Sequence, residues 1–306
     1  MYLKRCLLLF LMIACLLNAC LPDLIQNEVP ELDEYQIVFQ KINSNSRVLT
    51  FYNIEMNEIF NLAFTREVSR PIVSRSDKVI SLLHTSNNFS GIVDLETGRL
   101  KKCGGWPNSW IANDSQGDSP FDIIMATPST VYRYDLKDCE IKEVLIDFDN
   151  HRDTLKYDGG LMGFSMTPDS KQLYFGKERW SGMGLPTKFT LYRFQIAEND
   201  LSEIGEGISP SVSNGGNLLA YFSYNGLYLL DLATQITEKL LDFPEPNTVY
   251  PPQIYWSSDD TKLLFHFEPD RKAGDLFNNL EMIVFDLDKM EKTTLPIKGL
   301  YPSWIQ

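Results

Sequence analysis

The chain has 306 residues, of which 43% are hydrophobic and 12% aromatic, and its formal net charge is −13 at pH 7. This length is sufficient for a large core within one repeat-built domain. The negative charge opposes both phosphate backbones and anionic membrane surfaces, so the composition argues against a nucleic-acid partner.

The N-terminal residues 1–19 have the features of an export signal. Lys4 and Arg5 form a basic head, and the apolar stretch that follows is about a dozen residues long, which suits a signal-peptide core and is too short for a comfortable membrane span. The stretch ends in Leu17-Asn18-Ala19-Cys20, which resembles a bacterial lipobox. That resemblance implies a lipid anchor on Cys20, and an ordinary secretory signal with an incidental cysteine is the alternative.

The residues that follow the cysteine bear on location. The residue after Cys20 is Leu21 and not Asp. By resemblance to the enterobacterial sorting rule for lipoproteins, this favours the outer membrane of a two-membrane cell, or the cell surface if the cell has one membrane. Residues 20–34 then form the lipid-bearing cysteine and an acidic tether, and residues 35–306 form the folded domain. The predicted location is therefore a bacterial membrane, reached by export.

A three-residue pattern recurs six times along the folded part of the chain: an apolar residue, then Asp, Asn or Gln, then Leu or Ile. Each copy closes an apolar run with strand character, and most copies precede a polar turn. The copies are Tyr52-Asn53-Ile54, Val93-Asp94-Leu95, Tyr134-Asp135-Leu136, Phe194-Gln195-Ile196, Leu230-Asp231-Leu232 and Phe285-Asp286-Leu287.

Two further signals accompany the pattern. Upstream of it, a polar turn such as Ser258-Asp259-Asp260-Thr261 leads into an apolar strand, and Asp, Asn, Gly and Lys there suit a tight hairpin. Further upstream lies a short strand that often carries Pro and Ser, such as Pro210-Ser211-Val212-Ser213. Each unit therefore predicts four antiparallel strands, and a repeat of about 45 residues is typical of a β-propeller blade.

The C-terminal residues 301–305 allow the ring to close. Tyr301-Pro302-Ser303-Trp304-Ile305 looks like the innermost strand of a blade, yet no blade follows it, and the first blade lacks such a strand. Pairing this segment with blade one removes two open strand edges. We therefore predict an all-β fold, a six-bladed β-propeller of four-stranded antiparallel blades with the C-terminal strand in blade one. The predicted blades span residues 35–66, 70–103, 106–147, 160–205, 208–242 and 250–297.

These repeats resemble the TolB-like six-bladed propeller family, with its PD40 or WD40-like repeats. The family pattern Leu-Tyr-Leu-x-Asp-Leu-x-Thr-Gly is closely matched by residues 225–234 and 93–98, whereas Asn53 and Gln195 depart from it. The resemblance implies the fold over nearly all the mature chain. It implies little about function, because the matching residues build hairpins. The separate N-terminal domain of TolB has no counterpart, so TolB itself is not expected.

Cys103 and Cys139 are the cysteines that remain beyond the signal and the lipidated residue. An oxidising compartment would permit a bridge between them. The repeat alignment, however, places Cys139 in the turn before an outer strand and Cys103 at the end of an outer strand. These positions fall on opposite faces of neighbouring units, beyond disulfide reach. We therefore expect two free thiols.

The sequence contains no recognisable catalytic or metal-binding set. The Asp residues of the repeated pattern are expected to accept turn N–H groups rather than to form a ring of acids. The three histidines, His84, His151 and His266, do not have the spacing of a metal site. Nucleophile-elbow, Walker and dinucleotide motifs are absent, so no cofactor is expected. Calcium binding among the acidic loops stays open.

Loop length is the best clue to a binding surface. In a propeller, the loops that join second to third strands and the loops that join blades share one face, which we call the long-loop face. The long loops 147–160, 177–188, 242–251 and 268–280 belong to it, whereas the turns of the opposite face are mostly short, with Asn113–Ser119 as an exception. Its aromatic and arginine residues suit a protein, peptide or glycan partner, and variable loop decoration is the alternative. The candidate binding residues are His151, Arg152, Tyr157, Arg179, Trp180, Tyr250, Asp270, Arg271 and Phe277.

The favoured interpretation is a lipid-anchored, non-catalytic propeller that binds a protein or peptide partner in the cell envelope. The alternative is an enzyme that acts on a glycan or peptide at the pore mouth. His84, Glu178 or Glu268 would then be the acid–base groups, because they occupy equivalent strand ends. A structural envelope protein without a small ligand is the third interpretation.

Overall fold

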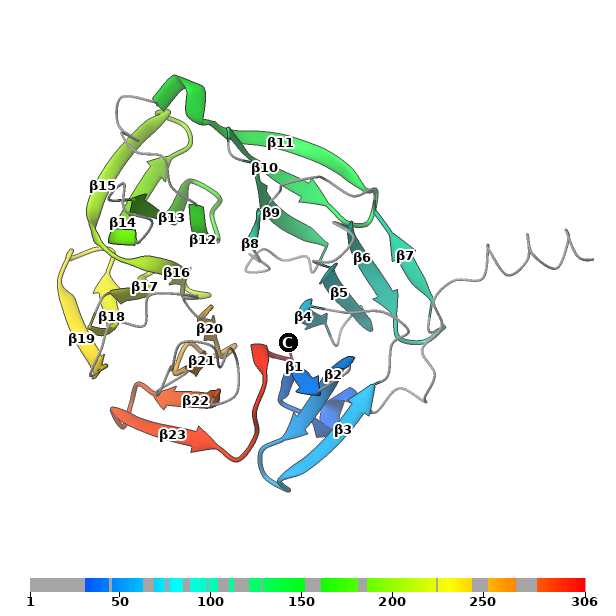
Figure 1. The fold of residues 1–306 in the computed structure, drawn as a ribbon. Coiled ribbons are helices and arrows are strands. Elements are labelled where there is room, and N and C mark those ends of the chain that lie inside the picture. The colour runs from blue at the N-terminus through cyan, green and yellow to red at the C-terminus, as the bar shows by residue number, and fades with distance from the viewer. Residues whose placement is uncertain are drawn as a thin grey trace, which may run out of the picture.

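The computed structural model describes residues 31–43, 46–62, 69–74, 77–84, 89–97, 99–103, 110–112, 121–127, 129–151, 161–180, 186–223, 225–243, 253–267 and 280–305. Within these ranges the chain forms six four-stranded sheets, arranged as blades around a ring (Figure 1). The helices of the described ranges are two short 3-10 turns, η1 (Leu32–Glu34) and η2 (Phe148–His151). No helix in those ranges is long and apolar enough to cross a membrane.

The strands of a blade follow one another in the chain from the innermost to the outermost, except in blade one. Blade one contains β24 (Leu300–Trp304), β1 (Ile37–Asn43), β2 (Ser46–Asn53) and β3 (Glu58–Leu62). Blade two contains β4 (Ser69–Ser74), β5 (Val79–His84), β6 (Phe89–Asp94) and β7 (Leu100–Lys102). Blade three contains β8 (Trp110–Ala112), β9 (Asp122–Ala126), β10 (Thr130–Asp135) and β11 (Glu140–Asp147). Blade four contains β12 (Leu161–Met166), β13 (Gln172–Trp180), β14 (Pro186–Gln195) and β15 (Asp200–Glu206). Blade five contains β16 (Ile208–Val212), β17 (Leu218–Ser223), β18 (Gly226–Asp231) and β19 (Thr237–Asp242). Blade six contains β20 (Tyr255–Trp256), β21 (Lys262–Phe267), β22 (Glu281–Asp286) and β23 (Glu291–Leu295).

The six-bladed all-β fold is confirmed, including the closure of the ring by the C-terminal strand. β24 pairs antiparallel with β1, so that Trp304 lies opposite Ile37. The Ile305 N–H then donates to Gln36 O at 2.9 Å, and Ile305 forms a parallel bridge with Val73 of blade two. The two ends of the described chain therefore meet in one blade.

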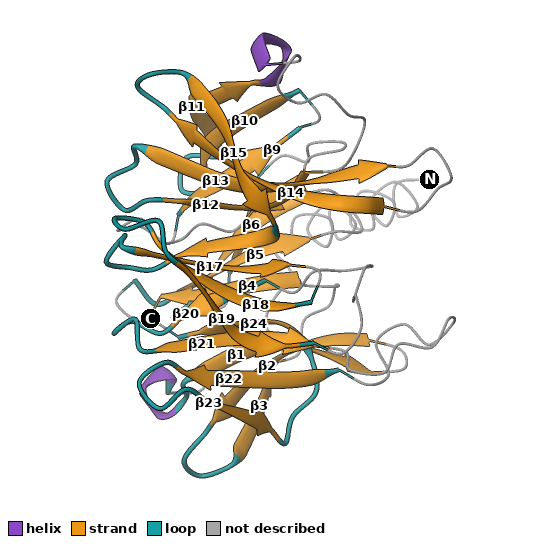
Figure 2. Cartoon of the chain, turned by 90° about the vertical axis from the view of Figure 1, so that its left-hand side faces the viewer, coloured by secondary structure: helices purple, strands orange, loops and turns teal. Residues whose placement is uncertain are grey.

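The repeated apolar–polar–apolar pattern ends the third strand of every blade, as the sequence predicted. In blades one, two, three, five and six, the polar side chain of the pattern accepts a backbone N–H from the following turn. The bond from Thr97 N to Asp94 Oδ1, for example, is 2.7 Å long. Gln195 of blade four differs, because its amide donates to Asp200 at 3.4 Å. These bonds hold the turns on one face of the ring, which we call the short-turn face (Figure 2).

The core lies between neighbouring blades. Because alternate residues of a strand point to opposite faces of its sheet, one strand serves two interfaces. Ile37 and Phe39 of β1 join the apolar cluster shared with blade six, whereas Val38 joins the cluster shared with blade two. The continuous apolar runs of the sequence therefore become blades that are apolar on both sides.

Two tryptophan side chains tie inner strands of adjacent blades together. Trp256 Nε1 donates to Ser211 O at 2.9 Å, which links blade six to blade five. Trp304 Nε1 donates to Tyr255 O at 3.2 Å, which links blade one to blade six. Both residues therefore act in the packing of adjacent blades.

The expectation of two free thiols is wrong, because Cys103 and Cys139 form a disulfide with their Cα atoms 5.1 Å apart. The expectation assumed an outer strand long enough to carry Cys103 to the far face. β7 has only three residues, so Cys103 stays near the turn that precedes the strand. There it lies beside the turn of blade three that holds Cys139, with Cys103 Sγ 3.2 Å from Leu136 O. Both cysteines pack in the apolar cluster between blades two and three.

Candidate functional site

Of the predicted binding residues, the structure describes His151 and the backbone of Arg179 and Trp180. The alternative acid–base residues His84 and Glu178 lie on β5 and β13. The remaining predicted residues lie outside the described ranges: Arg152, Tyr157, Tyr250, Glu268, Asp270, Arg271 and Phe277.

His151 is held at the rim between blades three and four. It is the last residue of η2, and its ring meets Phe194 of β14 edge-to-face with the centroids 5.5 Å apart. Its Nε2 lies 3.2 Å from Asn199 Oδ1, in the turn between β14 and β15. These contacts pack the imidazole against a turn of the short-turn face, so His151 does not join Arg179 and Trp180 at the long-loop end of the β13–β14 hairpin.

Arg179 and Trp180 lie on the longest hairpin of the described chain. β13 has nine residues and β14 has ten, whereas the second strands of the other blades have five to seven. The additional pairs lie at the long-loop end, where Arg179 is opposite Lys188 and Trp180 is opposite Pro186. Figure 2 shows this hairpin reaching away from the short turns. Paired backbone thus carries both residues beyond the usual end of a second strand.

The aspartates of the turns serve the fold. The Thr97 N–H lowers the pKa of Asp94, and the Thr234 N–H lowers the pKa of Asp231. Asp259, in the first hairpin of blade six, is the strongest case. The hydroxyl groups of Ser257 and Thr261 donate to its carboxylate at 2.6 and 2.9 Å and help to lower its pKa to about 2.

Acid is expected to weaken the propeller through these carboxylates. A carboxylate whose folded pKa lies below the unfolded value of 3.8 stabilises the fold above that value and loses this contribution as the pH falls toward the folded pKa. The urea midpoint, followed by tryptophan fluorescence, should therefore fall between about pH 5 and about pH 2. The Asp259→Asn variant should lose less stability over this interval. An equal loss in both proteins would contradict the role of Asp259.

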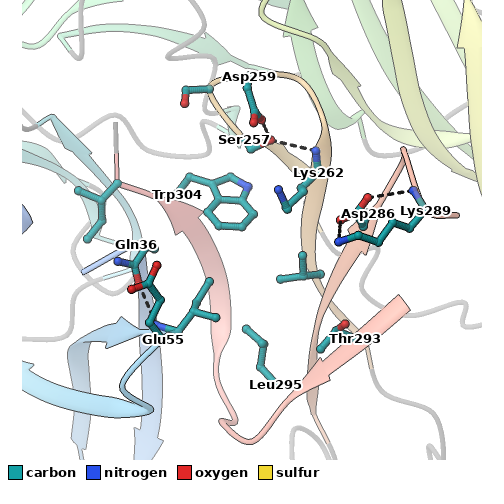
Figure 3. A pocket seen from close by; sticks show the side chains of 14 residues that line it. Gln36, Glu55, Ser257, Asp259, Lys262, Asp286, Lys289, Thr293, Leu295 and Trp304 are labelled. Atoms are coloured by element: carbon teal, nitrogen blue, oxygen red, sulfur yellow. Dashed lines mark hydrogen bonds and ion pairs between the residues drawn. The ribbon is translucent and has the colours of Figure 1, made fainter. Parts of the chain in front are cut away.

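A pocket of about 510 Å³ lies at the seam between blades six and one, and we call it the seam pocket (Figure 3). Its volume falls in the range of ligand sites. Glu55 and Lys289 of its lining belong to turns of the short-turn face, on blade one and blade six. Val284 and Leu295 supply an apolar surface and are only 9% and 6% exposed. The half-buried Trp304 indole lies between the walls from the two blades (Figure 3).

The charged groups of the seam pocket differ in how far they are paired. Asp286 accepts hydrogen bonds from both the backbone N–H and the Nζ of Lys289, each at 3.0 Å. Asp259 accepts the turn hydrogen bonds described above. Lys262 is the exception among the lysines of the pocket. Its Nζ reaches Thr261 Oγ1 at 3.4 Å, and among the described residues it has no carboxylate within ion-pair distance.

Sequence reasoning did not single out the seam pocket, because its walls come from both ends of the chain. Trp304 was predicted as part of an inner strand, and the structure shows that its indole N–H joins two blades while part of its ring lines the pocket. The available signal was the predicted ring closure, since a strand donated by the C-terminus places the last blade beside the first.

The described residues show no arrangement for a metal ion. No group of three or more His, Cys, Asp or Glu side chains in those ranges is placed to hold one. His266 is buried on β21, and its ring lies edge-to-face with Tyr301 at a centroid distance of 5.7 Å. This histidine therefore packs at the junction of blades six and one.

Solved structures of other proteins share this fold. TolB from Acinetobacter baumannii aligns with a TM-score of 0.64 and 15% identity, over 90% of this chain and 68% of that chain. A putative TolB from Agrobacterium tumefaciens aligns with a TM-score of 0.58 and 15% identity, over 87% and 91% of the two chains. An oligogalacturonate lyase in complex with manganese aligns with a TM-score of 0.54 and 11% identity, over 89% and 76%. These likenesses establish a TolB-like six-bladed fold. No family model and no curated protein matches the chain.

Proposed function

We propose that this chain is a lipid-anchored, non-catalytic propeller that binds a protein or peptide partner in the cell envelope through its long-loop face. The observation that carries the proposal is the extended β13–β14 hairpin with Arg179 and Trp180. A paired hairpin costs less ordering entropy on binding than a free loop does. Tryptophan and arginine are also enriched among the residues that dominate interface energies.

The lipid anchor on Cys20 is the second part of the proposal. It rests on the predicted signal and lipobox, and the Cys103–Cys139 disulfide suits an oxidising compartment. Mass spectrometry of the N-terminal peptide should detect acyl chains on Cys20, and Cys20→Ser should release the protein from the membrane fraction. A Cys20→Ser variant that stays with the membranes would refute the anchor.

The binding face can be tested by affinity capture. The chain from residue 20 onward, with Cys20→Ser, would be immobilised and exposed to solubilised envelope from its own organism. The double variant Arg179→Ala, Trp180→Ala should recover the partner roughly tenfold less well. Ile236→Ala is the matched control, because Ile236 is 67% exposed in a turn of the opposite face. Equal recovery by all three proteins would contradict the assignment.

A further inference from the structure

We infer that the seam pocket is a second binding site, which takes a peptide segment that carries an acidic residue beside an apolar side chain. The seam pocket lies on the short-turn face, opposite the β13–β14 hairpin. It uses none of the residues assigned to the long-loop face, so this inference stands or falls separately from the proposed function.

The apolar part of the site centres on Trp304. Its ring is partly exposed in the seam pocket, next to the buried side chains of Val284 and Leu295. An apolar side chain placed there would remove the remaining ring surface from water and complete the packing. Burial of that surface supplies affinity without any movement of the blades.

Exposed methionines follow two of the lining residues in the chain. Met56 is 59% exposed and follows Glu55 in the chain, and Met290 is 48% exposed and follows Lys289. The two turns that flank the pocket therefore each present a flexible apolar side chain, a residue type common at binding surfaces that adapt to their partners. A partner that contacts both turns as well as the pocket would need to be a chain of several residues.

Lys262 is the residue that would bind the acidic group of the ligand. It is a half-buried residue whose ammonium group carries three donors, and within the described ranges it makes a single long hydrogen bond, to Thr261, while its charge also acts on Asp259 and Asp286 at longer range. The nearby Asp259 and Asp286 already accept hydrogen bonds within their own turns. A ligand carboxylate would give Lys262 a charge-assisted hydrogen bond. The chain as a whole is acidic, so this attraction acts only at short range and does not speed association.

A ligand in the seam pocket would also stabilise the closed ring of blades. Gln36 comes from the start of blade one, Trp304 from the last strand and Lys262 from blade six, and a ligand that touches all three resists their separation. Because such a ligand binds the closed ring and not the unfolded chain, it should raise the melting temperature as its concentration rises.

The test uses three fluorescein-labelled pentapeptides with blocked ends, Ala-Leu-Asp-Leu-Ala and its Asn and Lys counterparts, with fluorescence anisotropy as the readout. The protein is the chain from residue 20 onward with Cys20→Ser, because every described strand lies beyond that point. The Asp peptide should bind at least about tenfold more tightly than the Asn peptide, because only its carboxylate gives Lys262 a charge-assisted hydrogen bond. The Lys peptide should bind least.

Two variants locate the site. Lys262→Met should lower the affinity for the Asp peptide to that for the Asn peptide. Thr293→Trp should abolish binding of both peptides, because Thr293 is an exposed lining residue of the pocket and a bulky ring there fills the cavity. Lys171→Met is the matched control, since Lys171 is an exposed lysine in the corresponding hairpin of blade four, and it should leave binding unchanged. Unaltered melting temperatures without peptide would show that the variants fold.

Several outcomes would overturn the inference. Equal binding of the Asp and Asn peptides would remove the role of Lys262, and unchanged binding by Thr293→Trp would move the site elsewhere. Absence of binding up to the solubility limit of the Asp peptide would remove the site altogether. Tighter binding after deletion of residues 21–30 would reassign the pocket to the acidic segment of the chain itself.

Discussion

Deletion of residues 300–306 is expected to leave the ring open and to abolish the stable fold. β24 supplies the innermost strand of blade one, and Leu300 and Ile305 are only 3% and 7% exposed. The deletion also removes the Trp304 hydrogen bond to blade six and exposes the free edge of β1. We expect a loss of at least about 5 kcal/mol, which is comparable to the whole stability of many domains.

Urea unfolding followed by circular dichroism would measure this loss, and size-exclusion chromatography would detect association through the open edge. A synthetic peptide of residues 299–306, added in trans, should restore part of the stability, because it supplies the missing strand. Lys298→Ala is the control, since Lys298 is exposed and its replacement should change stability by less than about 0.5 kcal/mol. A truncated chain with the urea midpoint of the full chain would disprove ring closure by β24.

Loss of the Cys103–Cys139 disulfide is expected to have the second largest effect. The bond closes a loop with a sequence separation of 36, for which loop entropy alone predicts a stabilisation of about 4 kcal/mol. It also fastens blade two to blade three where the outer strand β7 is short. Cys103→Ala and Cys139→Ala should each lower the free energy of unfolding by roughly 3–4 kcal/mol.

The double variant shows whether the bond itself is responsible. Cys103→Ala combined with Cys139→Ala should be about as stable as either single variant, because the first change already removes the bond. A reductant should lower the stability of the unchanged chain to the same level and leave the variants as they are. Additive losses in the double variant, or a reductant without effect, would show that the two side chains act only by packing.

The fold was predictable from the sequence because the blade repeats a local rule. A polar residue that ends the third strand and binds the next turn produces the same hairpin wherever it occurs, and Asn53, Asp94 and Asp286 each do so. Ring closure followed from one unmatched strand at the C-terminus. The hairpins depend on residues that are neighbours in sequence, and the prediction of ring closure depends on a count of the strands in each blade.

The disulfide and the seam pocket were not predictable in the same way. Whether Cys103 reaches Cys139 depends on the length of β7, and a strand that ends after three residues leaves no clear mark in the sequence. The seam pocket joins Glu55, Lys262 and Trp304, which belong to three separate segments with no shared motif. For the long-loop face, Arg179 and Trp180 remain predictions from the sequence, and the structure adds the length of the β13–β14 hairpin that carries them.

The strand order of blade one also determines when the ring of blades can close during synthesis of the chain. β1 is among the first strands to be synthesised, and its inner partner β24 is the last. Contacts between segments so far apart in sequence form late, because the entropy of closing the intervening loop must be overcome first. Until then the nascent chain carries an exposed strand edge, which can recruit strands from other chains. A chain cut short before β24 is therefore expected to stay open and prone to aggregation, even though every other described strand has been made.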